Sequence, residues 1–538
     1  MASLTPKSGV LGRRLATHLL RRTTFHFTRL RIDQIAAMTP DQAVEDLMNI
    51  PPVTISEPID PQTGQPWINS GAAAGSLTGL LRDYVKSWWI NEARLDPSIG
   101  HKMMLFLHSS FVVAATEGTA EEYFDYLALL RFYALGSYKT LARKMTLDNQ
   151  MLRYLDNTQN NRNSPNENYA REFLELFTIG KGPQAGPGDY TNYTEEDIVQ
   201  AAKLLSGFKV RANRVDIDPD TGIPMGYANR NQHNFDDKTF SSAFQNQMIA
   251  GKTTAEGMFE ELEEFVTMIF GQSATAKTLS RKLYRFFVSP NITAEIESDV
   301  IEPMAQTLLS NNYELMPVMK LLLKSEHFYD ADDNDSQDEI IGGLMKSPLE
   351  LVLHTMSYFE VTVPDPISDP QNHYFKFYTQ GLVRAFLPLA GMDIFKPSDV
   401  AGYPAYYQEP DYQRNWFNSS TIVARYQLPE MLIKGKRLLY NQTLGAKLDI
   451  VEYVSTHISD PANASILVQE LIDDLLPEGT DPDRYAYYRD VTFLDGIPLY
   501  DWTADWQNFL LSGDDAEVRP PLESLLTSLL YSQEFQAM

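Results

Sequence analysis

The chain has 538 residues, of which 43% are hydrophobic and 11% aromatic, so it can build a large core rich in rings. Its 45 Lys and Arg stand against 71 Asp and Glu, and the resulting formal net charge of −26 argues against nucleic acid and anionic lipid surfaces as partners. There is no cysteine, which excludes disulfides, thiolate metal sites and a cysteine nucleophile.

The beginning of the chain has none of the features of a secretory signal. Basic residues are scattered through MASLTPKSGVLGRRLATHLLRRTTF, which lacks an unbroken apolar segment and a small-residue cleavage site. We therefore expect a cytoplasmic protein if Met1 is the native start. The alternative is an exported protein whose signal has been removed. No uninterrupted apolar run of about 18 residues occurs, so membrane insertion is not expected.

Helical periodicity dominates the first part of the chain. The segment HKMMLFLHSSFVVAA at 101–115 is apolar nearly all round, which predicts a central, buried helix. Thr194 and Asp197 form a capping box at the start of another helix. The helices expected here cover residues 14–22, 41–49, 78–98, 101–115, 120–135, 138–156, 164–180 and 194–208.

The segment SPNENYAREFLELFTIGKG at 164–182 predicts a helix with a clear start and a clear stop. Ser164 is the expected N-cap, with proline in the first turn and Glu167 completing a capping box. Gly180 supplies the stop. Ser164, Glu167 and Arg171 are therefore assigned structural roles.

Glu172 is the exception on this predicted helix. At about 100° per residue it lies inside the apolar arc of its neighbours, where a carboxylate must be paired, hydrogen-bonded, metal-bound or protonated. One interpretation is a buried ion pair with an arginine such as Arg131 or Arg143. The other is a metal or acid–base site, because Glu175 lies one turn further on and can face the same cation.

Two histidines are further candidates. His108 lies on the predicted buried helix, where a histidine with satisfied hydrogen bonds is more common than a metal ligand. His233 lies in the loop sequence NRNQHNFDDKTF, beside Asp236 and Lys238. Loop histidines next to acids are good functional candidates, although a solvated loop explains the pattern equally well.

The whole chain predicts a mainly α class: a large multi-helix globular fold with long irregular loop excursions and one or two short β-hairpins. Five parts are expected. They are an N-terminal helical core with the polar motifs (1–208), a loop or hairpin excursion (209–253), a second helical part (254–360), an irregular segment rich in Pro and Tyr (361–420) and a C-terminal helical part (421–538).

Several motifs in order resemble one bacterial family, domain of unknown function 1800 (DUF1800), over almost the full length. They are HLLRRTTF at 18–25, LFLHSSF at 105–111, SPNENYAREFLELFTIG at 164–180, QHNFDDKTFSSAF at 232–244 and ATAKTLSRKLYRFFV at 274–288. The insertion between Gly182 and Tyr193 is most similar to members from the Bacteroidetes. The resemblance implies a polar metal or active site on a helical scaffold. It also implies gene neighbours that resemble alkaline phosphatases and sulfatases, and many family members carry a secretion signal.

The chain departs from the family motifs at four positions. Ser110 replaces the second histidine of a His-x-His pair, and Asn234 replaces the Asp after the loop histidine. Phe177 stands where histidine is frequent, and Tyr403 replaces a tryptophan. These replacements indicate a scaffold that is kept while its polar site is eroded.

Three functions follow as hypotheses. The first is a non-catalytic structural or interaction protein, a subunit of a larger assembly formed with protein partners or by self-assembly. The second is a metal-dependent enzyme, a hydrolase, with a single divalent ion held by His108, Glu172, Glu175 and His233, and with Asp236 as a substitute ligand. The third is an accessory subunit of a sulfatase- or phosphatase-like companion.

Overall fold

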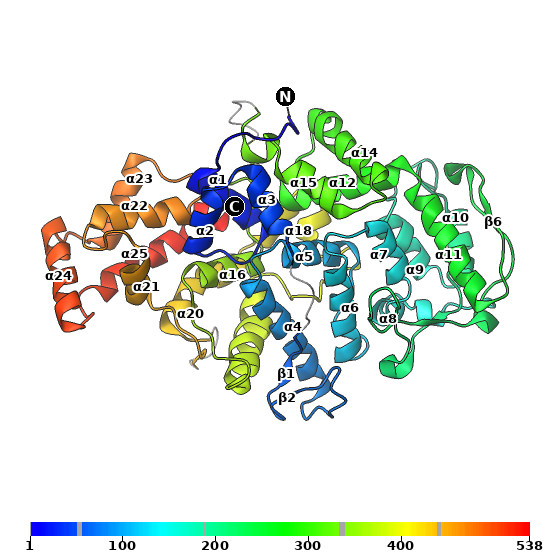
Figure 1. Cartoon of the computed structure of the whole chain (residues 1–538), viewed down its shortest axis with the longest axis horizontal. Coiled ribbons are helices and arrows are strands. Elements are labelled where there is room, and N and C mark those ends of the chain that lie inside the picture. The colour runs from blue at the N-terminus through cyan, green and yellow to red at the C-terminus, as the bar shows by residue number, and fades with distance from the viewer. Residues whose placement is uncertain (1, 51–55, 188, 333–338, 438–442) are drawn as a thin grey trace.

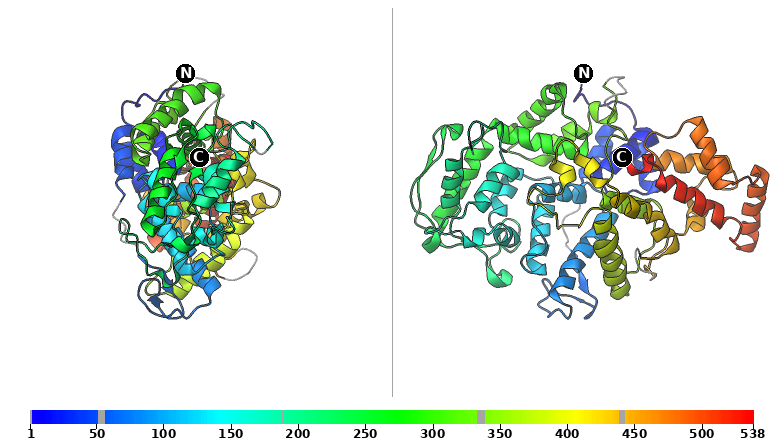
Figure 2. Two further views of the ribbon diagram at one scale, coloured as in Figure 1. Left: turned by 90° about the vertical axis from the view of Figure 1, so that its right-hand side faces the viewer. Right: turned by 180° about the vertical axis from the view of Figure 1, so that it is seen from behind.

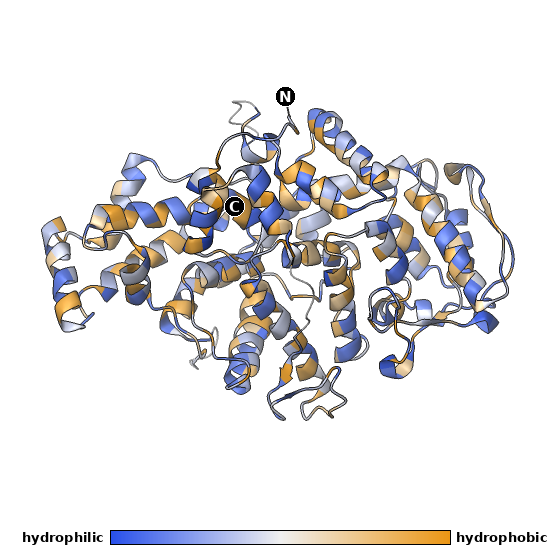
Figure 3. Ribbon diagram, viewed as in Figure 1, coloured by the Kyte–Doolittle hydropathy of each residue, from blue (hydrophilic) through white to orange (hydrophobic). Residues whose placement is uncertain are grey.

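Helices with apolar stripes make up most of the chain, as the mainly α prediction requires (Figure 1). The structure is a computed structural model that describes residues 2–50, 56–187, 189–332, 339–437 and 443–538. Apolar and hydrophilic residues alternate around the helices in Figure 3, which is the pattern of helices that bury one face. Within the described residues no helix is long and apolar enough to cross a membrane.

The helices follow in chain order. The first part contains α1 (Gly12–Thr23), α2 (Arg29–Ala36), α3 (Pro40–Met48), α4 (Thr78–Leu95), α5 (Gly100–Ser110), α6 (Ala120–Phe132), α7 (Tyr138–Met145), α8 (Asn149–Tyr154), α9 (Asn168–Glu172) and α10 (Glu195–Leu204). The middle contains α11 (Ala255–Phe270), α12 (Ser273–Phe287), α13 (Ala294–Ile296), α14 (Glu302–Ser310), α15 (Leu315–Leu323) and α16 (Pro348–Tyr358). The last part contains α17 (Leu387–Leu389), α18 (Pro404–Tyr407), α19 (Thr421–Tyr426), α20 (Leu428–Lys434), α21 (Ile450–His457), α22 (Ala464–Leu475), α23 (Pro482–Ala486), α24 (Leu499–Ser512) and α25 (Arg519–Tyr531).

The described residues also form three two-stranded antiparallel sheets, where one or two hairpins were expected. They pair β1 (Ile59–Asp60) with β2 (Gln65–Pro66), β3 (Phe208–Lys209) with β4 (Tyr227–Ala228), and β5 (Lys238–Thr239) with β6 (Met248–Ile249). Two of the three sheets, β3–β4 and β5–β6, lie in or at the edge of the predicted excursion. Their strands contact α10 and α11, so the excursion folds back onto these helices.

Two element predictions are wrong. The helix expected at 164–180 begins only at Asn168, and after Glu172 it continues as the π-helical turn η2 (Phe173–Phe177). Ser164 instead bonds back to Asn161, and Glu167 makes no capping hydrogen bond. The segment 361–420, expected to be irregular, contains the long π-helical segment η8 (Gln371–Phe386), which packs on α4.

The parts of the chain share one hydrophobic core, which runs from Ala2 to Phe535 among the described residues. Figure 1 and the reverse view in Figure 2 place α24 at one end of a long axis and α10, α11 and β6 at the other. Helix α1 lies between these ends and contacts α22, so the start of the chain packs on its C-terminal part.

Five buried basic side chains form what we call the basic cluster, in which all but Arg21 lie within electrostatic range of Glu350. They are Arg21, Arg22, Lys102, Lys346 and Arg425, and each is only 1% exposed. Lys102 pairs with Glu350, whereas Arg21 donates to the carbonyl oxygen of Asp474 (2.6 Å) and Lys346 to that of Phe535 (2.6 Å). Burial lowers the pKa of Arg22 to about 9 and that of Lys346 well below its usual value. The cluster ties segments from both ends of the chain to its centre.

Candidate functional site

The π-helical turn η2 positions the two glutamates that the sequence singled out. Thr178 donates its hydroxyl to the carbonyl oxygen of Phe173 (2.6 Å), and Gly180, at φ +73°, donates its amide to that of Leu174 (2.9 Å). Widened helical turns of this kind occur often at functional sites. Here the turn buries its aromatic side chains and leaves Glu172 and Glu175 half-buried.

Within the part of the chain that the structure describes, Glu172 does not form the expected buried ion pair. Arg131 pairs with Asp96 (3.4 Å) and Arg143 with Glu263 (3.0 Å), so both predicted partners are engaged elsewhere. Burial and, to a smaller extent, the neighbouring charge of Glu175 raise the pKa of Glu172 to about 7. Near neutral pH this carboxyl group therefore exchanges its proton readily.

The structural roles expected beside Glu172 are filled in a different way. Arg171 pairs with Glu195 through both terminal nitrogens (2.8 Å each) and with Glu167 at 3.4 Å. Through these contacts Glu167 and Arg171 hold α9 against the start of α10. The capping box of Thr194 and Asp197 at that start is confirmed.

Glu175 lines a small cavity of about 160 Å³ between α5, η2, α12 and α18. Its carboxylate pairs with Lys181 and accepts a hydrogen bond from the hydroxyl of Tyr193 (3.1 Å). The cavity is lined by Phe106, Ser109, Ser110, Val112, Glu175, Leu176, Lys282, Arg285, Phe286, Val400, Ala401, Tyr406 and Tyr407. We call it the Lys282 cavity.

Two cations of α12, Lys282 and Arg285, line this cavity one turn apart. The amine of Lys282 donates to the carbonyl oxygen of Leu176, and burial lowers its pKa to about 8. The guanidinium of Arg285 lies 5.1 Å from the ring of Tyr412 and reaches Glu409 at 3.5 Å. Its buried Nε has no hydrogen-bond partner within the described part of the chain.

His108 lies outside the cavity, in an aromatic part of the core. Its Nδ1 donates to the hydroxyl of Tyr126 (2.9 Å), because that hydroxyl itself donates to the carbonyl oxygen of Phe111 (2.6 Å). Burial lowers the pKa of His108 to about 3, so the ring is neutral. Its centroid lies 4.9 Å from that of Phe395.

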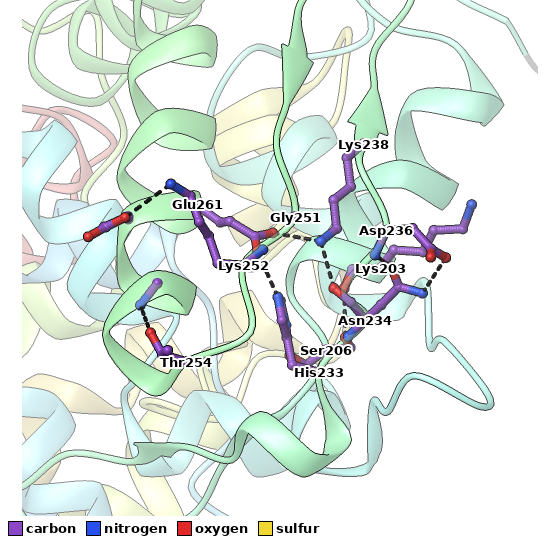
Figure 4. A network of polar contacts seen from close by, with 12 residues as sticks. Lys203, Ser206, His233, Asn234, Asp236, Lys238, Gly251, Lys252, Thr254 and Glu261 are labelled. Carbon is purple, nitrogen blue, oxygen red and sulfur yellow. Dashed lines mark hydrogen bonds and ion pairs between the residues drawn. The ribbon is translucent and has the colours of Figure 1, made fainter.

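His233 is fully buried in a separate polar network (Figure 4). Its Nδ1 faces the carbonyl oxygen of Ser206 (2.8 Å) and its Nε2 faces Glu261 (3.0 Å). Lys238 donates to the other oxygen of Glu261 (2.6 Å) and to the carbonyl oxygen of Asn234 (2.7 Å). Both ring nitrogens thus lie within hydrogen-bond distance of an oxygen atom. The network pins the excursion to α11.

The predicted metal ligands are not brought together. Among the described residues no group of three or more His, Asp or Glu side chains is arranged to hold a metal ion. Asp236 is exposed and accepts a hydrogen bond from the side chain of Asn234 (3.1 Å). His108, His233 and Glu175 have different neighbours: an aromatic core, the Glu261 network and the Lys282 cavity. Glu172, at the end of α9, is not part of the cavity lining.

The four departures from the family motifs also separate in space. Ser110 lines the Lys282 cavity, whereas Phe177 packs in the core against Phe111 (ring centroids 5.3 Å apart). Tyr403 lies near His108 and donates its hydroxyl to the carbonyl oxygen of Asp393 (2.8 Å). Asn234 lies in the Glu261 network, where its carbonyl oxygen accepts a hydrogen bond from Lys238 (2.7 Å).

Sequence reasoning missed Lys282, Arg285 and Glu261. A signal for Lys282 was present, because it lies three residues after Leu279 and four before Phe286, on the apolar stripe of its helix. Glu261 had the same kind of signal, since it lies three residues after Met258 and four residues before Phe265.

Comparisons with known proteins give one match. None of the curated proteins and none of the solved structures matches the chain. The family described as protein of unknown function (DUF1800) matches residues 18–537, which is nearly the whole chain. The chain belongs to the DUF1800 family.

Proposed function

We propose that this chain is a non-catalytic binding subunit that holds a small anion in the Lys282 cavity. One observation carries the proposal. Two cations of α12 line the cavity, while its one lining carboxylate, Glu175, already has Lys181 as a partner. Arg285 reaches Glu409 at 3.5 Å through one terminal nitrogen, and its Nε has no partner among the described residues. Lys282 forms no ion pair within that part of the chain, so the lining keeps a positive excess in a chain with a net charge of −26.

The lining favours a compact carboxylate, phosphate or sulfate. Arg and Lys recognise such groups through charge-assisted hydrogen bonds, and the buried, unpaired Nε of Arg285 is a ready donor. The hydroxyls of Ser109 and Tyr407 lie in the same lining. A cavity of about 150 Å³ can hold one benzene molecule, so the ligand is small.

Calorimetric titration with inorganic phosphate, sulfate and acetate tests this proposal. Lys282→Met should weaken anion binding by about tenfold or more, because it removes a charge-assisted hydrogen bond worth about 1.5–3 kcal/mol. Lys277→Met is the matched control, since Lys277 lies on the same helix and pairs with Glu302 outside the cavity. Equal affinities of the two variants would contradict the proposal.

The pH dependence gives a second measure of the same site. The pKa of Lys282 is lowered to about 8, so the amine is charged below that pH and loses its proton above it. Anion affinity should therefore fall as the pH rises through about 8. Lys282→Arg keeps its charge and should abolish that fall.

A second candidate function, acid–base catalysis, is favoured by the pKa of Glu172, which is raised to about 7. The active site of this candidate contains Glu172 and Glu175 from the hydrolase hypothesis but neither His108 nor His233. Hydrolysis of p-nitrophenyl acetate, phosphate or sulfate by a protonated Glu172 should fall as the pH rises through about 7. It should disappear in Glu172→Gln and persist in Glu167→Gln. Hydrolysis that survives Glu172→Gln would contradict this candidate.

Two further proposals concern the lineage of the chain and a companion protein. The insertion between Gly182 and Tyr193 supports a Bacteroidetes-like member of the family. A sulfatase- or phosphatase-like companion fits an anion-binding subunit, since the substrates of such enzymes carry the same anionic groups.

A further inference from the structure

Exposed apolar side chains concentrate at one end of the molecule. Tyr500 is 72% exposed, Leu510 64% and Leu511 88%. The set, which we call the α24 surface, comprises Tyr487, Val491, Ile497, Leu499, Tyr500, Leu510 and Leu511. All seven lie within 25 consecutive residues, on or beside the outermost helix (Figure 1). Large exposed apolar side chains that gather in one part of a surface mark interaction sites.

Helix α24 has two apolar faces. Trp502 and Trp506 are 1% and 2% exposed and face the body of the molecule, where the indole of Trp502 donates to the carbonyl oxygen of Pro461 (3.0 Å). Tyr500 and Leu511 are eleven residues apart and so fall on one stripe, about 140° and about 160° from the centre of the tryptophan face. A surface helix needs only one apolar face, so the second face is unexplained by the fold of a single chain.

The charges around this surface are almost all negative. Between Tyr487 and Glu517 there are seven acidic residues and one basic residue, Arg489. That arginine is already paired with Asp490 (2.7 Å). A second copy docking through the same surface would bring these like charges together, whereas Lys and Arg around an apolar partner would be attracted.

We infer that the α24 surface docks a basic, amphipathic segment of another protein, with Tyr500 and Leu511 as its apolar anchors. The apolar stripe supplies the contact, and the acidic residues on either side select a partner with lysine or arginine at its rim. The inference is independent of the Lys282 cavity, which lies on other elements. Failure of anion binding therefore leaves it untouched.

The test uses a fluorescent helical peptide of leucine and lysine in which the leucines form one face. The full chain should bind it with an affinity that falls as salt is raised. Leu511→Asp and Tyr500→Asp should each weaken binding by about tenfold, which corresponds to about 1.4 kcal/mol. Both side chains are exposed, so both variants should fold as the parent does, which circular dichroism checks.

The control is Ile367→Asp, at a residue that is 78% exposed and far along the chain from α24. It adds the same negative charge, which by electrostatics alone would tighten binding of a cationic peptide. Weakening confined to the α24 variants therefore reports the apolar contact. Unchanged affinity of Leu511→Asp, or equal binding of a leucine and glutamate peptide, would overturn the inference. Light scattering that shows an oligomer dissociated by Leu511→Asp would assign the surface to a second copy and overturn it too.

Discussion

A histidine beside acids in a polar loop looks available for chemistry, yet His233 is used to fasten a loop. Its partner Glu261 lies 28 residues further along the chain, on α11. The sequence allowed a polar role for His233 but could not show that partner, because nothing local links a loop histidine to a carboxylate on a later helix. The same limit explains Glu172, whose predicted arginine partners pair with other acids.

Glu261 should be among the costliest carboxylates to remove. Glu261→Ala leaves Lys238 and His233 buried without an anion, and breaking one partner of a buried pair costs about 3–5 kcal/mol. Urea unfolding measures the loss. Glu263→Ala is the control on the same helix, because its pairs are half exposed and should be worth about 1 kcal/mol or less. Equal losses in the two variants would show that the network does not hold the excursion.

At the scale of elements, the sequence predicted helices well where local signals agree. The expected 41–49 is α3 (Pro40–Met48), which starts with a capping box of Thr39 and Gln42. Prediction failed where the backbone leaves the ordinary α-helical pattern. The turn η2 and the segment η8 are π-helical, and a periodicity of about 3.6 residues carries no information on that change. The position of the Lys282 cavity depends on η2, so it was hidden as well.

The excursion offers a prediction about one backbone contact. A Cβ at Gly251 would lie 2.0 Å from the carbonyl oxygen of Phe235, so Gly251→Ala must push the end of the β5–β6 hairpin off its neighbour. Hydrogen exchange should become faster across residues 233–252, and the melting temperature should fall. Gly79→Ala, where the new Cβ meets nothing within 4 Å, should leave both unchanged. An unaltered exchange pattern in Gly251→Ala would mean that the hairpin is not seated by this contact.

For the whole molecule, fold class and family followed from the sequence, because both rest on patterns spread along the entire chain. The positions of the buried charges could not be predicted from the sequence. A net charge of −26 says nothing of the five cations of the basic cluster, which come from segments up to about 400 residues apart. Burying a cation costs less when it has a counter-ion and hydrogen-bond acceptors, and here Glu350 and backbone carbonyls supply them.

The hydrogen bonds of the basic cluster imply that the protein tolerates substitution of the accepting residues much better than substitution of the donating residues. Arg21, Arg22 and Lys346 donate mainly to main-chain oxygens, at Asp474, Val288 and Phe535 among others. Every amino acid has a main-chain carbonyl oxygen, so substitution of the side chains at the accepting positions leaves these hydrogen bonds intact. The donors have no such freedom, since only a long cationic side chain reaches across the core. In divergent relatives, the residues that supply the carbonyl oxygens can therefore change while the cationic residues that donate to them stay the same.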